Sequence, residues 1–388
     1  MTNQIFSTKS ILFLVLFFLI MPLSIKKSKA VLTCQVSNLR TDTLTLSPIN
    51  ISAGPDLPVG SIIYRGTWND KDFLNDLKCT SDVGNGDSAD VIYRLGIASA
   101  PYPLSTLSIP GQSGYSGKAY TTNVPGIGAV IVDYTYGYPA THLEDQTMGR
   151  FTLQMNSQGP QYFGHAKKFD LILIKIGPTP PGGYTLNASS LPSAKVFGVA
   201  SVISKLKGLP ADTRKIVFNG SLRVNAQTCT TPDVNVELGS HNMSAYPKVG
   251  DASPWVPFNI RLTNCPVFYG NFPGSNPVNL TSGSSVTPTP TSNKIGVSLT
   301  PNSSILDVEK GIMALSTEIG AATGFGIQVA RYSISPQIIS FADEFKVDLP
   351  RTGVATWNVP MSARYIRTEL KGEPGKANGK LTFTINYY

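Results

Sequence analysis

The chain has 388 residues, of which 14% are charged, and it contains 35 glycines and 29 prolines. This length predicts about two or three domains, and short apolar runs separated by Gly and Pro are typical of strands joined by turns. The formal net charge is +8, but no Lys- or Arg-rich run with interleaved aromatic residues is present, which argues against nucleic acid as a partner. Since no amphipathic helix of convincing length appears, we expect an all-β protein.

Residues 1–30 differ in kind from the rest of the chain. Lys9 precedes an apolar run from Ile11 to Ile25, and small residues at Ser28 and Ala30 occupy the positions that a signal peptidase reads. A retained membrane anchor is the alternative, but a run of about fifteen residues is shorter than the roughly twenty that a spanning helix needs. We therefore predict a signal peptide over residues 1–30, whose removal lowers the formal net charge to +4.

The next part of the chain, up to about residue 225, carries a series of short apolar runs. Turn signals such as Gly84–Gly86 and Pro181–Gly183 separate these runs, and such spacing favours a β-sandwich or barrel. The runs predicted as strands are Leu44–Leu46, Ile62–Arg65, Val91–Leu95, Ala129–Val132, Phe151–Leu153, Leu171–Ile176, Val196–Val199 and Ile216–Phe218.

The chain contains four cysteines, namely Cys34, Cys79, Cys229 and Cys265. An even number in an exported chain predicts disulfides. The first and second pairs are separated by 150 residues, which favours the bridges Cys34–Cys79 and Cys229–Cys265, one in each half. A zinc site is the alternative, yet no two cysteines are close enough in sequence for the usual paired-ligand knuckle.

A short polar segment, Asn225–Thr228, is the predicted linker between two domains, residues 31–225 and 226–388. Within the second domain, Asn271–Asn293 is rich in Pro, Ser, Thr and Asn, a composition that predicts a long surface excursion rather than core.

The last residues of the chain have the period of a half-buried strand. Leu381, Phe383, Ile385 and Tyr387 are apolar at every second position, and polar residues stand between them. A terminal strand with an apolar face needs a partner, because an open edge invites aggregation.

A glycine fourteen places from the end, Gly375, and the penultimate tyrosine, Tyr387, resemble the C-terminal signature of subunits of bacterial chaperone–usher fimbriae. Further stretches match this family in its order over roughly the last 160 residues: Cys229, 234–239 (VNVELG), 258–266 (FNIRLTNCP), 324–328 (GFGIQ) and 363–368 (ARYIRT).

This resemblance implies two immunoglobulin-like β-sandwiches in tandem, the second of which is an incomplete pilin domain that lacks its last strand. A partner strand fills the resulting groove by β-strand addition. Leu381, Phe383, Ile385 and Tyr387 would line one edge of that groove, together with Gly375. A periplasmic chaperone would occupy it first, and then, at an outer-membrane usher, the donor strand of the next subunit.

The first domain resembles, less closely, the receptor-binding domain of two-domain fimbrial tip adhesins, through Cys34, Cys79 and residues 169–178 (FDLILIKIGP). After cleavage at Ala30 only three residues precede Cys34, whereas a donated strand needs about ten. Such a subunit can accept a strand but has none to give, so we expect it at the fimbrial tip on the cell surface.

Candidate receptor-binding residues follow the second cysteine. Carboxylates and amides recognise sugar hydroxyls through paired hydrogen bonds, and the loop after Cys79 carries Asp82, Asn85, Asp87 and Asp90. A solvated turn is the alternative interpretation of this loop.

Aromatic rings offer apolar faces for pyranose rings, and Trp68, in a loop-like neighbourhood, and Tyr136 are the candidates. If residues 134–138 are extended, Tyr134, Tyr136 and Tyr138 share one face, which can also serve packing.

His142 and His165 raise the alternative of a zinc-dependent adhesin, because some tip adhesins bind zinc through histidine. They lie 23 residues apart and would need a carboxylate such as Glu144 or Asp145. We expect no cofactor, and no catalytic motif such as Gly-x-Ser-x-Gly is present, so an enzyme is not expected.

The sequence thus predicts a fimbrial tip adhesin that attaches bacteria to a host receptor, most simply a glycan. The alternative is a structural tip or assembly-initiating subunit whose first domain binds a protein or an abiotic surface.

Overall fold

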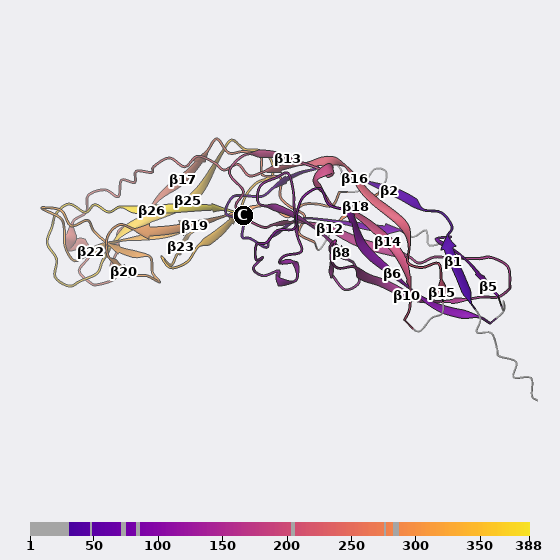
Figure 1. Ribbon diagram of the computed structural model, residues 1–388. Coiled ribbons are helices and arrows are strands. Elements are labelled where there is room, and N and C mark those ends of the chain that lie inside the picture. Colours follow the sequence, from indigo (N-terminus) through magenta and orange to yellow (C-terminus); the bar gives the residue numbers. More distant parts are fainter. Residues whose placement is uncertain are drawn as a thin grey trace, which may run out of the picture.

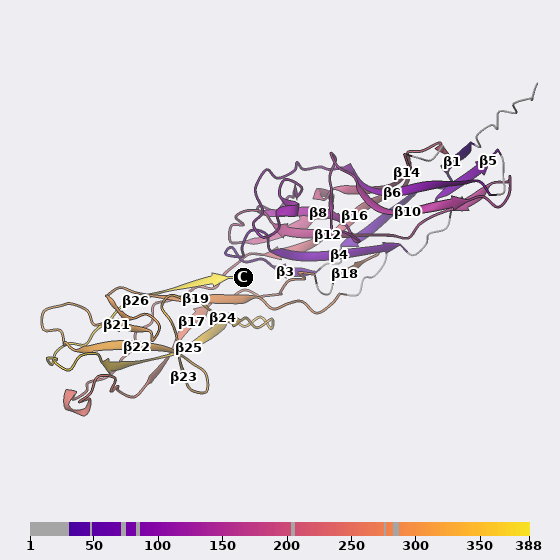
Figure 2. The same ribbon diagram turned by 90° about the horizontal axis from the view of Figure 1, so that it is seen from below.

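The computed structural model describes residues 31–46, 49–70, 75–82, 86–202, 206–274, 277–281 and 287–388. The predicted signal peptide, residues 1–30, and Asn85 lie outside these ranges. The molecule is elongated, with an N-terminal half and a C-terminal half, and the C-terminus lies where the two meet (Figures 1 and 2). The described helices are three short 3-10 turns, η2 (Ser113–Tyr115), η3 (Ala188–Ser190) and η4 (Met243–Ala245). The expectation of an all-β protein is confirmed.

The N-terminal half contains three sheets. One is ordered β10 (Gln146–Gln154), β6 (Ser88–Ser99), β14 (Ser193–Ala200), β16 (Ala211–Asn225) and β13 (Gly183–Asn187), with β2 (Arg40–Leu46) and β3 (Asn50–Ser52) parallel to β16. The second is ordered β18 (Val278–Leu280), β4 (Ile62–Asp70), β12 (Lys167–Lys175), β8 (Ile127–Asp133) and β7 (Tyr120–Thr121), with β9 (Pro139–Ala140) beside β8. The third is ordered β11 (Gln161–Phe163), β5 (Leu77–Ser81), β1 (Leu32–Val36) and β15 (Leu206–Lys207).

The C-terminal half contains two sheets. The larger is ordered β17 (Val256–Thr263), β25 (Thr356–Arg367), β22 (Phe325–Tyr332), β21 (Ile312–Ala314) and β20 (Ile305–Asp307), with β23 (Pro336–Ile338) beside β22. The smaller is ordered β24 (Phe345–Asp348), β19 (Lys294–Pro301) and β26 (Leu381–Tyr387).

All eight runs predicted as strands in the N-terminal half are strands. These strands differ in how many of their faces are covered. A strand covered on one face alternates buried and exposed residues, while a strand covered on both faces is apolar throughout. β10 alternates over most of its length, whereas every residue of β8 is buried.

The two halves have separate hydrophobic cores and separate disulfides. Cys34 is bridged to Cys79 across the β1–β5 pair, and Cys229 is bridged to Cys265. These are the two bridges favoured from the sequence, and the chain has no free cysteine.

A group of buried charges joins strands of two N-terminal sheets to Asp76, which directly precedes β5 of the third. The Lys167 Nζ at the start of β12 lies 2.5 Å from the Asp76 Oδ2, and both side chains are about 1% exposed or less. Arg214 of β16 is equally buried and lies 2.8 Å from Asp70 at the end of β4. The Tyr93 hydroxyl of β6 also donates to Asp76, at 3.3 Å. Burial lowers the pKa of Lys167, while the hydrogen bond to Asp76 opposes that shift.

The prediction that Asn271–Asn293 is a surface excursion rather than core is wrong for part of this segment. Phe272, Val278 and Leu280 are 3% exposed or less and belong to the core of the N-terminal half, and β18 extends the sheet that contains β4. The composition of this segment hid its placement, because its few apolar residues are spaced among many Pro, Ser, Thr and Asn residues.

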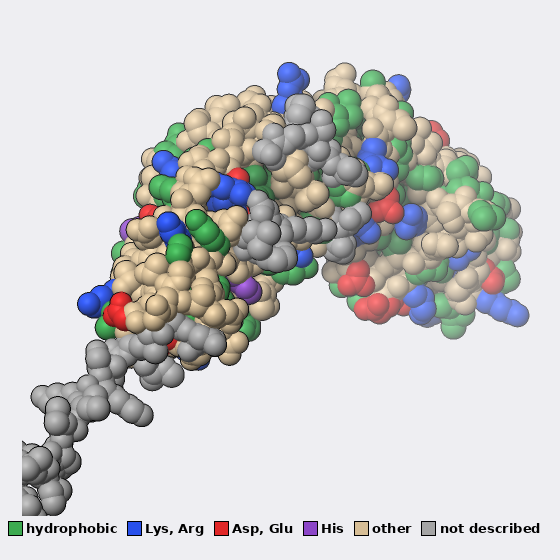
Figure 3. All heavy atoms as spheres, turned by 90° about the vertical axis from the view of Figure 1, so that its right-hand side faces the viewer, with side chains coloured by type: hydrophobic (Ala, Val, Ile, Leu, Met, Phe, Trp, Pro, Cys, Tyr) green, Lys and Arg blue, Asp and Glu red, His purple; other side chains and the backbone are tan. Residues whose placement is uncertain are grey.

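No helix in the described ranges is both long enough and apolar enough to span a membrane. Figure 3 looks onto the end of the molecule farthest from the C-terminal half. On the described surface of that view, Lys and Arg side chains are scattered and form no continuous basic patch.

Candidate functional site

The principal candidate site is a groove along the free edge of β26. This strand pairs with β19 on one side only. Leu381, Phe383 and Ile385 are half-buried, whereas Thr382 and Thr384 between them are exposed. The alternation expected from the sequence is therefore present. In the described chain, the backbone along the other edge of β26 has no neighbouring strand.

The opposite wall is the segment Asp233–Gly239, which the structure assigns to no strand. Val234, Val236 and Leu238 are half-buried and alternate with exposed residues. The sequence analysis did not assign these residues to the groove, although their period of two was a signal that could have indicated it.

The floor of the groove is the core of the C-terminal half, and the cavity has a volume of about 1060 Å³. Apolar side chains from β17, β19, β21, β22 and β25 form it: Phe258, Ile260, Leu299, Met313, Ile327, Val329 and Met361. A groove with two unpaired edges and an apolar floor fits an extended chain, in which every second side chain points the same way about 7 Å apart. Such a strand would supply both main-chain hydrogen bonds and alternate apolar side chains.

Gly375 lines one end of the groove at a close approach of two backbones. A Cβ atom at this position would lie 2.4 Å from the Gly320 carbonyl oxygen, too near for any side chain. The neighbouring Lys376 forms a bridge with Ala321. Glycine is therefore required here for steric reasons.

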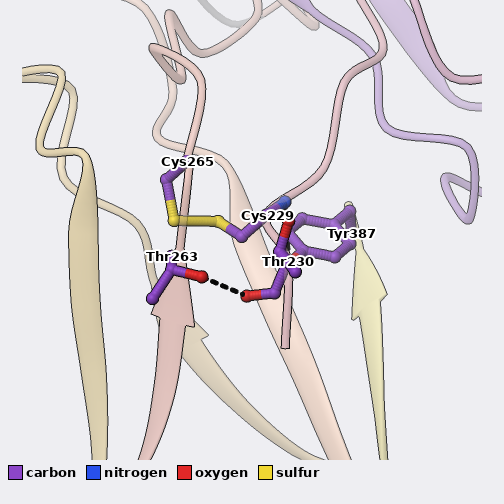
Figure 4. The surroundings of a disulfide bond; sticks show 5 residues. All are labelled: Cys229, Thr230, Thr263, Cys265 and Tyr387. Atoms are coloured by element: carbon purple, nitrogen blue, oxygen red, sulfur yellow. Dashed lines mark hydrogen bonds between the residues drawn. A yellow bond between two sulfur atoms is a disulfide. The ribbon is translucent and has the colours of Figure 1, made fainter. Parts of the chain in front are cut away.

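Tyr387 anchors the end of β26 beside Cys229 of the disulfide (Figure 4). Its hydroxyl accepts a hydrogen bond from the Cys229 backbone N–H at 3.2 Å, and its ring stacks on Phe268 at 6.0 Å between centroids. Burial is the main cause of the raised pKa of this tyrosine. Tyr387 is 5% exposed, so it fixes the strand rather than offering a surface to a partner.

The acidic candidates of the N-terminal half lie at the end of β5 and the start of β6. Asp82 follows β5 directly and is exposed. The Asp87 carboxylate accepts a hydrogen bond from the Ser81 hydroxyl at 2.6 Å, and the Asp90 carboxylate accepts one from Thr152 at 2.7 Å. Asp90 of β6 thus contacts the neighbouring strand β10, and Asp87 contacts the last residue of β5, while Asp82 faces solvent.

Trp68 is not in a loop, which corrects the sequence analysis. It lies in β4, is 6% exposed and packs on Phe169 with the ring centroids 5.2 Å apart. A buried indole cannot offer its face to a sugar. The missed signal was the predicted strand Ile62–Arg65, which continues through Trp68 as β4.

Tyr136 lies in an exposed turn between β8 and β9, together with Tyr134 and Tyr138. This stretch is a turn rather than an extended strand, yet all three rings are about half-exposed or more. The Tyr136 and Tyr138 rings stack at 6.1 Å, and the Lys168 Nζ lies 3.1 Å from the centroid of Tyr134.

Asp133 braces this turn. Its buried carboxylate accepts a hydrogen bond from the Tyr136 backbone N–H at 2.6 Å, and its own backbone N–H donates to the Tyr138 carbonyl at 2.9 Å. The tyrosine turn, residues 134–138, is therefore held in one shape. In the described chain no hydrogen bond or ring contact joins it to Asp82 or Trp68.

The two histidines of the N-terminal half have separate aromatic partners. The His142 Nδ1 lies 3.1 Å from the Tyr120 hydroxyl, and His165 stacks on Tyr93 and Phe151. The described residues contain no group of three or more His, Cys, Asp or Glu side chains placed to hold a metal ion.

His165 is expected to make stability depend on pH. Burial and the neighbouring Lys167 lower its pKa from 6.5, while Asp76 opposes this shift. The unfolded chain therefore takes up a proton first, and stability is lost as the pH falls through about 6.5 towards the folded-state pKa. We expect the free energy of unfolding of the full chain, measured in urea, to differ less between pH 7.5 and pH 5.0 in His165→Phe than in the wild type. The exposed-site control His241→Gln should retain the wild-type difference, and an unchanged difference in His165→Phe would contradict the prediction.

Comparisons with known proteins relate the chain to fimbrial proteins. Residues 216–388 match the family model described as fimbrial protein. The uncharacterized fimbrial-like protein YraH of Escherichia coli (strain K12) is 27% identical over 197 residues, which cover 49% of this chain and 95% of the relative. The probable major fimbrial subunit LpfA of Escherichia coli O157:H7 is 26% identical over 208 residues, covering 53% and 94%.

Among solved structures, the CupB6 tip adhesin from Pseudomonas aeruginosa is 17% identical, with a TM-score of 0.31, and the match covers 92% of this chain and 94% of that one. The groove lies wholly within the part of the chain that matches the family model. Through residues 216–388, the chain is similar to the fimbrial protein family.

Proposed function

We propose that the chain is the tip adhesin of a chaperone–usher fimbria. Its C-terminal half, residues 226–388, accepts a strand in the groove, and its N-terminal half, residues 31–225, contacts a host receptor. The observation that carries the proposal is the open apolar groove beside β26 in the part of the chain that matches the fimbrial family model. A periplasmic chaperone fills this groove first, and the donor strand of the next subunit replaces it at the outer-membrane usher.

The position at the tip is supported by what the first described strand does. β1 pairs with β5 and β15, its Leu32 and Cys34 are buried, and Cys34 is bridged to Cys79. Residues 32–36 are therefore used within the N-terminal half and are not available to fill the groove of a neighbouring subunit. Export in this scheme uses the predicted signal peptide and passes through the periplasm to the cell surface.

For the receptor we propose a glycan, which the tyrosine turn contacts. Exposed tyrosine rings present apolar faces and hydroxyls together, a combination that suits pyranose rings. Lys168 beside Tyr134 adds hydrogen-bond donors. Because Asp133 already fixes the turn, little conformational entropy is lost when a ligand binds.

Replacing both Tyr136 and Tyr138 with Ala is expected to weaken binding of the full chain on a glycan array by about tenfold or more, which corresponds to roughly 1.4 kcal/mol. The control Tyr162→Ala removes another exposed tyrosine, on β11, and should bind as the wild type does. Asp82→Ala tests the acidic loop separately.

The two parts of the proposal can fail separately. If the full chain enters fimbriae but binds no glycan on the array, the receptor is a protein or an abiotic surface, or the chain is a structural tip or assembly-initiating subunit. If glycan binding is unchanged in the tyrosine double variant and lost in Asp82→Ala, the acidic loop is the receptor site.

A further inference from the structure

A segment of the C-terminal half crosses to the N-terminal half and returns. We call its described residues, 269–274 and 277–281, the clasp. The clasp leaves after Cys265 and comes back before β19, and at its base the backbones of Asn271 and Thr291 donate to each other's carbonyls at 3.0 and 2.8 Å. In Figure 2, β18 lies with β3 and β4 in the N-terminal half, away from β17 and β19, which flank it in sequence.

The clasp is joined to the N-terminal half through its backbone. The Phe272 N–H donates to the Ile63 carbonyl at 3.0 Å, and the carbonyls of Gly270 and Thr281 accept from Ser52 and Thr45 at 2.9 and 3.1 Å. Between these contacts β18 runs parallel to β4, with Val278 opposite Gly66 and Leu280 opposite Trp68. β12 covers the other edge of β4, so without the clasp β4 would be an edge strand.

Side chains of the clasp complete the core that they enter. Phe272 packs edge-on against Tyr64 at 6.5 Å, and Val278 and Leu280 are 1% exposed or less. Leu280 lies over Gly66, where an added Cβ would be 2.8 Å from the leucine Cγ. Asn279 between them is exposed. The complementarity of Gly66 and Leu280 indicates a built interface rather than a loop that happens to rest on a surface.

Polar contacts at the junction fix the base of the clasp to both halves. The Asn293 side-chain amide donates to the carbonyls of Ser52 at 3.3 Å and Tyr388 at 3.0 Å, and its oxygen accepts from the Gly270 N–H at 2.8 Å. One buried side chain thus joins the N-terminal half, the clasp and the end of β26.

We propose that the clasp is a strand that the C-terminal half donates to the N-terminal half within the same chain, and that it both completes the core of the N-terminal half and fixes the orientation of that half. Residues 31–225 alone lack this strand and expose the apolar side of β4. The two halves are connected by the clasp as well as by the linker Asn225–Thr228. This inference depends only on intrachain contacts and does not rest on the proposed receptor.

A cleavable linker tests the clasp in the full chain. A protease recognition sequence inserted between Gln227 and Thr228 allows the covalent connection between the halves to be cut. No disulfide links the two halves, since each disulfide lies within a single half. After cleavage, the two fragments are expected to co-elute in size-exclusion chromatography at micromolar concentration. Fragments that separate at once would overturn the proposal.

Matched substitutions on adjacent residues of β18 then assign the association to the clasp. Leu280→Asp should make the cleaved halves elute separately, while Asn279→Asp should leave them together. If Leu280→Asp does not fold, Leu280→Ala serves instead, with a dissociation constant raised at least about thirtyfold. Equal association of Leu280 and Asn279 variants would show that other junction contacts hold the halves, and the assignment of the clasp would be wrong.

Discussion

Replacing Phe383 with Asp is expected to abolish recovery of the soluble full chain from the periplasm when it is co-expressed with its fimbrial chaperone. Phe383 is half-buried, lines the groove and packs against the core of the C-terminal half. A carboxylate in this position cannot be covered by an apolar strand without losing its hydration, which costs several kcal/mol. The subunit would then reach the periplasm without a stable partner strand. The measurement is the yield of full chain that co-purifies with the chaperone.

The neighbouring residue provides the control for this experiment. Thr384 lies on the same strand, but its side chain is exposed on the other face. Thr384→Asp introduces the same charge one residue away and should leave the co-purified yield close to that of the wild type. Equal yields for the Phe383 and Thr384 variants would refute the assignment of the groove as the strand-accepting site.

The second large effect is expected from the buried charges of the N-terminal half. Asp76→Asn leaves the Lys167 ammonium, which is fully buried, without its 2.5 Å carboxylate partner. Removing one member of a buried ion pair typically costs about 3–5 kcal/mol because the remaining charge stays desolvated. We expect the midpoint of urea unfolding to move to a clearly lower urea concentration. Hydrogen exchange of residues 77–81 and 167–175 monitors this unfolding.

A double variant distinguishes lost charge pairing from lost packing. Asp76→Leu combined with Lys167→Met replaces both charges with apolar side chains, so no desolvated ammonium remains at this site. Its stability should lie well above that of Asp76→Asn. If the double variant is the less stable of the two, the contribution of this site comes from the wider polar network, which includes Tyr93 and Arg214.

Local patterns carried most of the fold prediction. A period of two along Leu381–Tyr387 requires only that one face of a strand is buried, and each of the eight runs predicted in the N-terminal half is a strand for the same local reason. The pairing of the cysteines was also accessible, since each bridge closes a short sequence separation, 45 and 36 residues.

The candidate sites were predicted less well, because exposure depends on what lies above a strand. The pattern around Trp68 does not reveal that Phe169 of β12 covers it, and the tyrosines of residues 134–138 are exposed because Asp133 bends that stretch into a turn. Asp87 and Asp90 are engaged by hydroxyl groups 6 and 62 residues away in sequence.

The all-β class, the strands and the apolar alternation of the last strand could be derived from the sequence, because each depends on residues that are near one another in the chain. The two disulfides followed from the spacing of the four cysteines. The groove opposite β26, the buried Lys167–Asp76 pair and the contacts of residues 269–274 and 277–281 with the N-terminal half could not be derived from it. These features depend on which strands become neighbours. That choice is made by packing over the whole molecule, where three apolar side chains among Pro, Ser and Thr are enough to place a strand in a distant core.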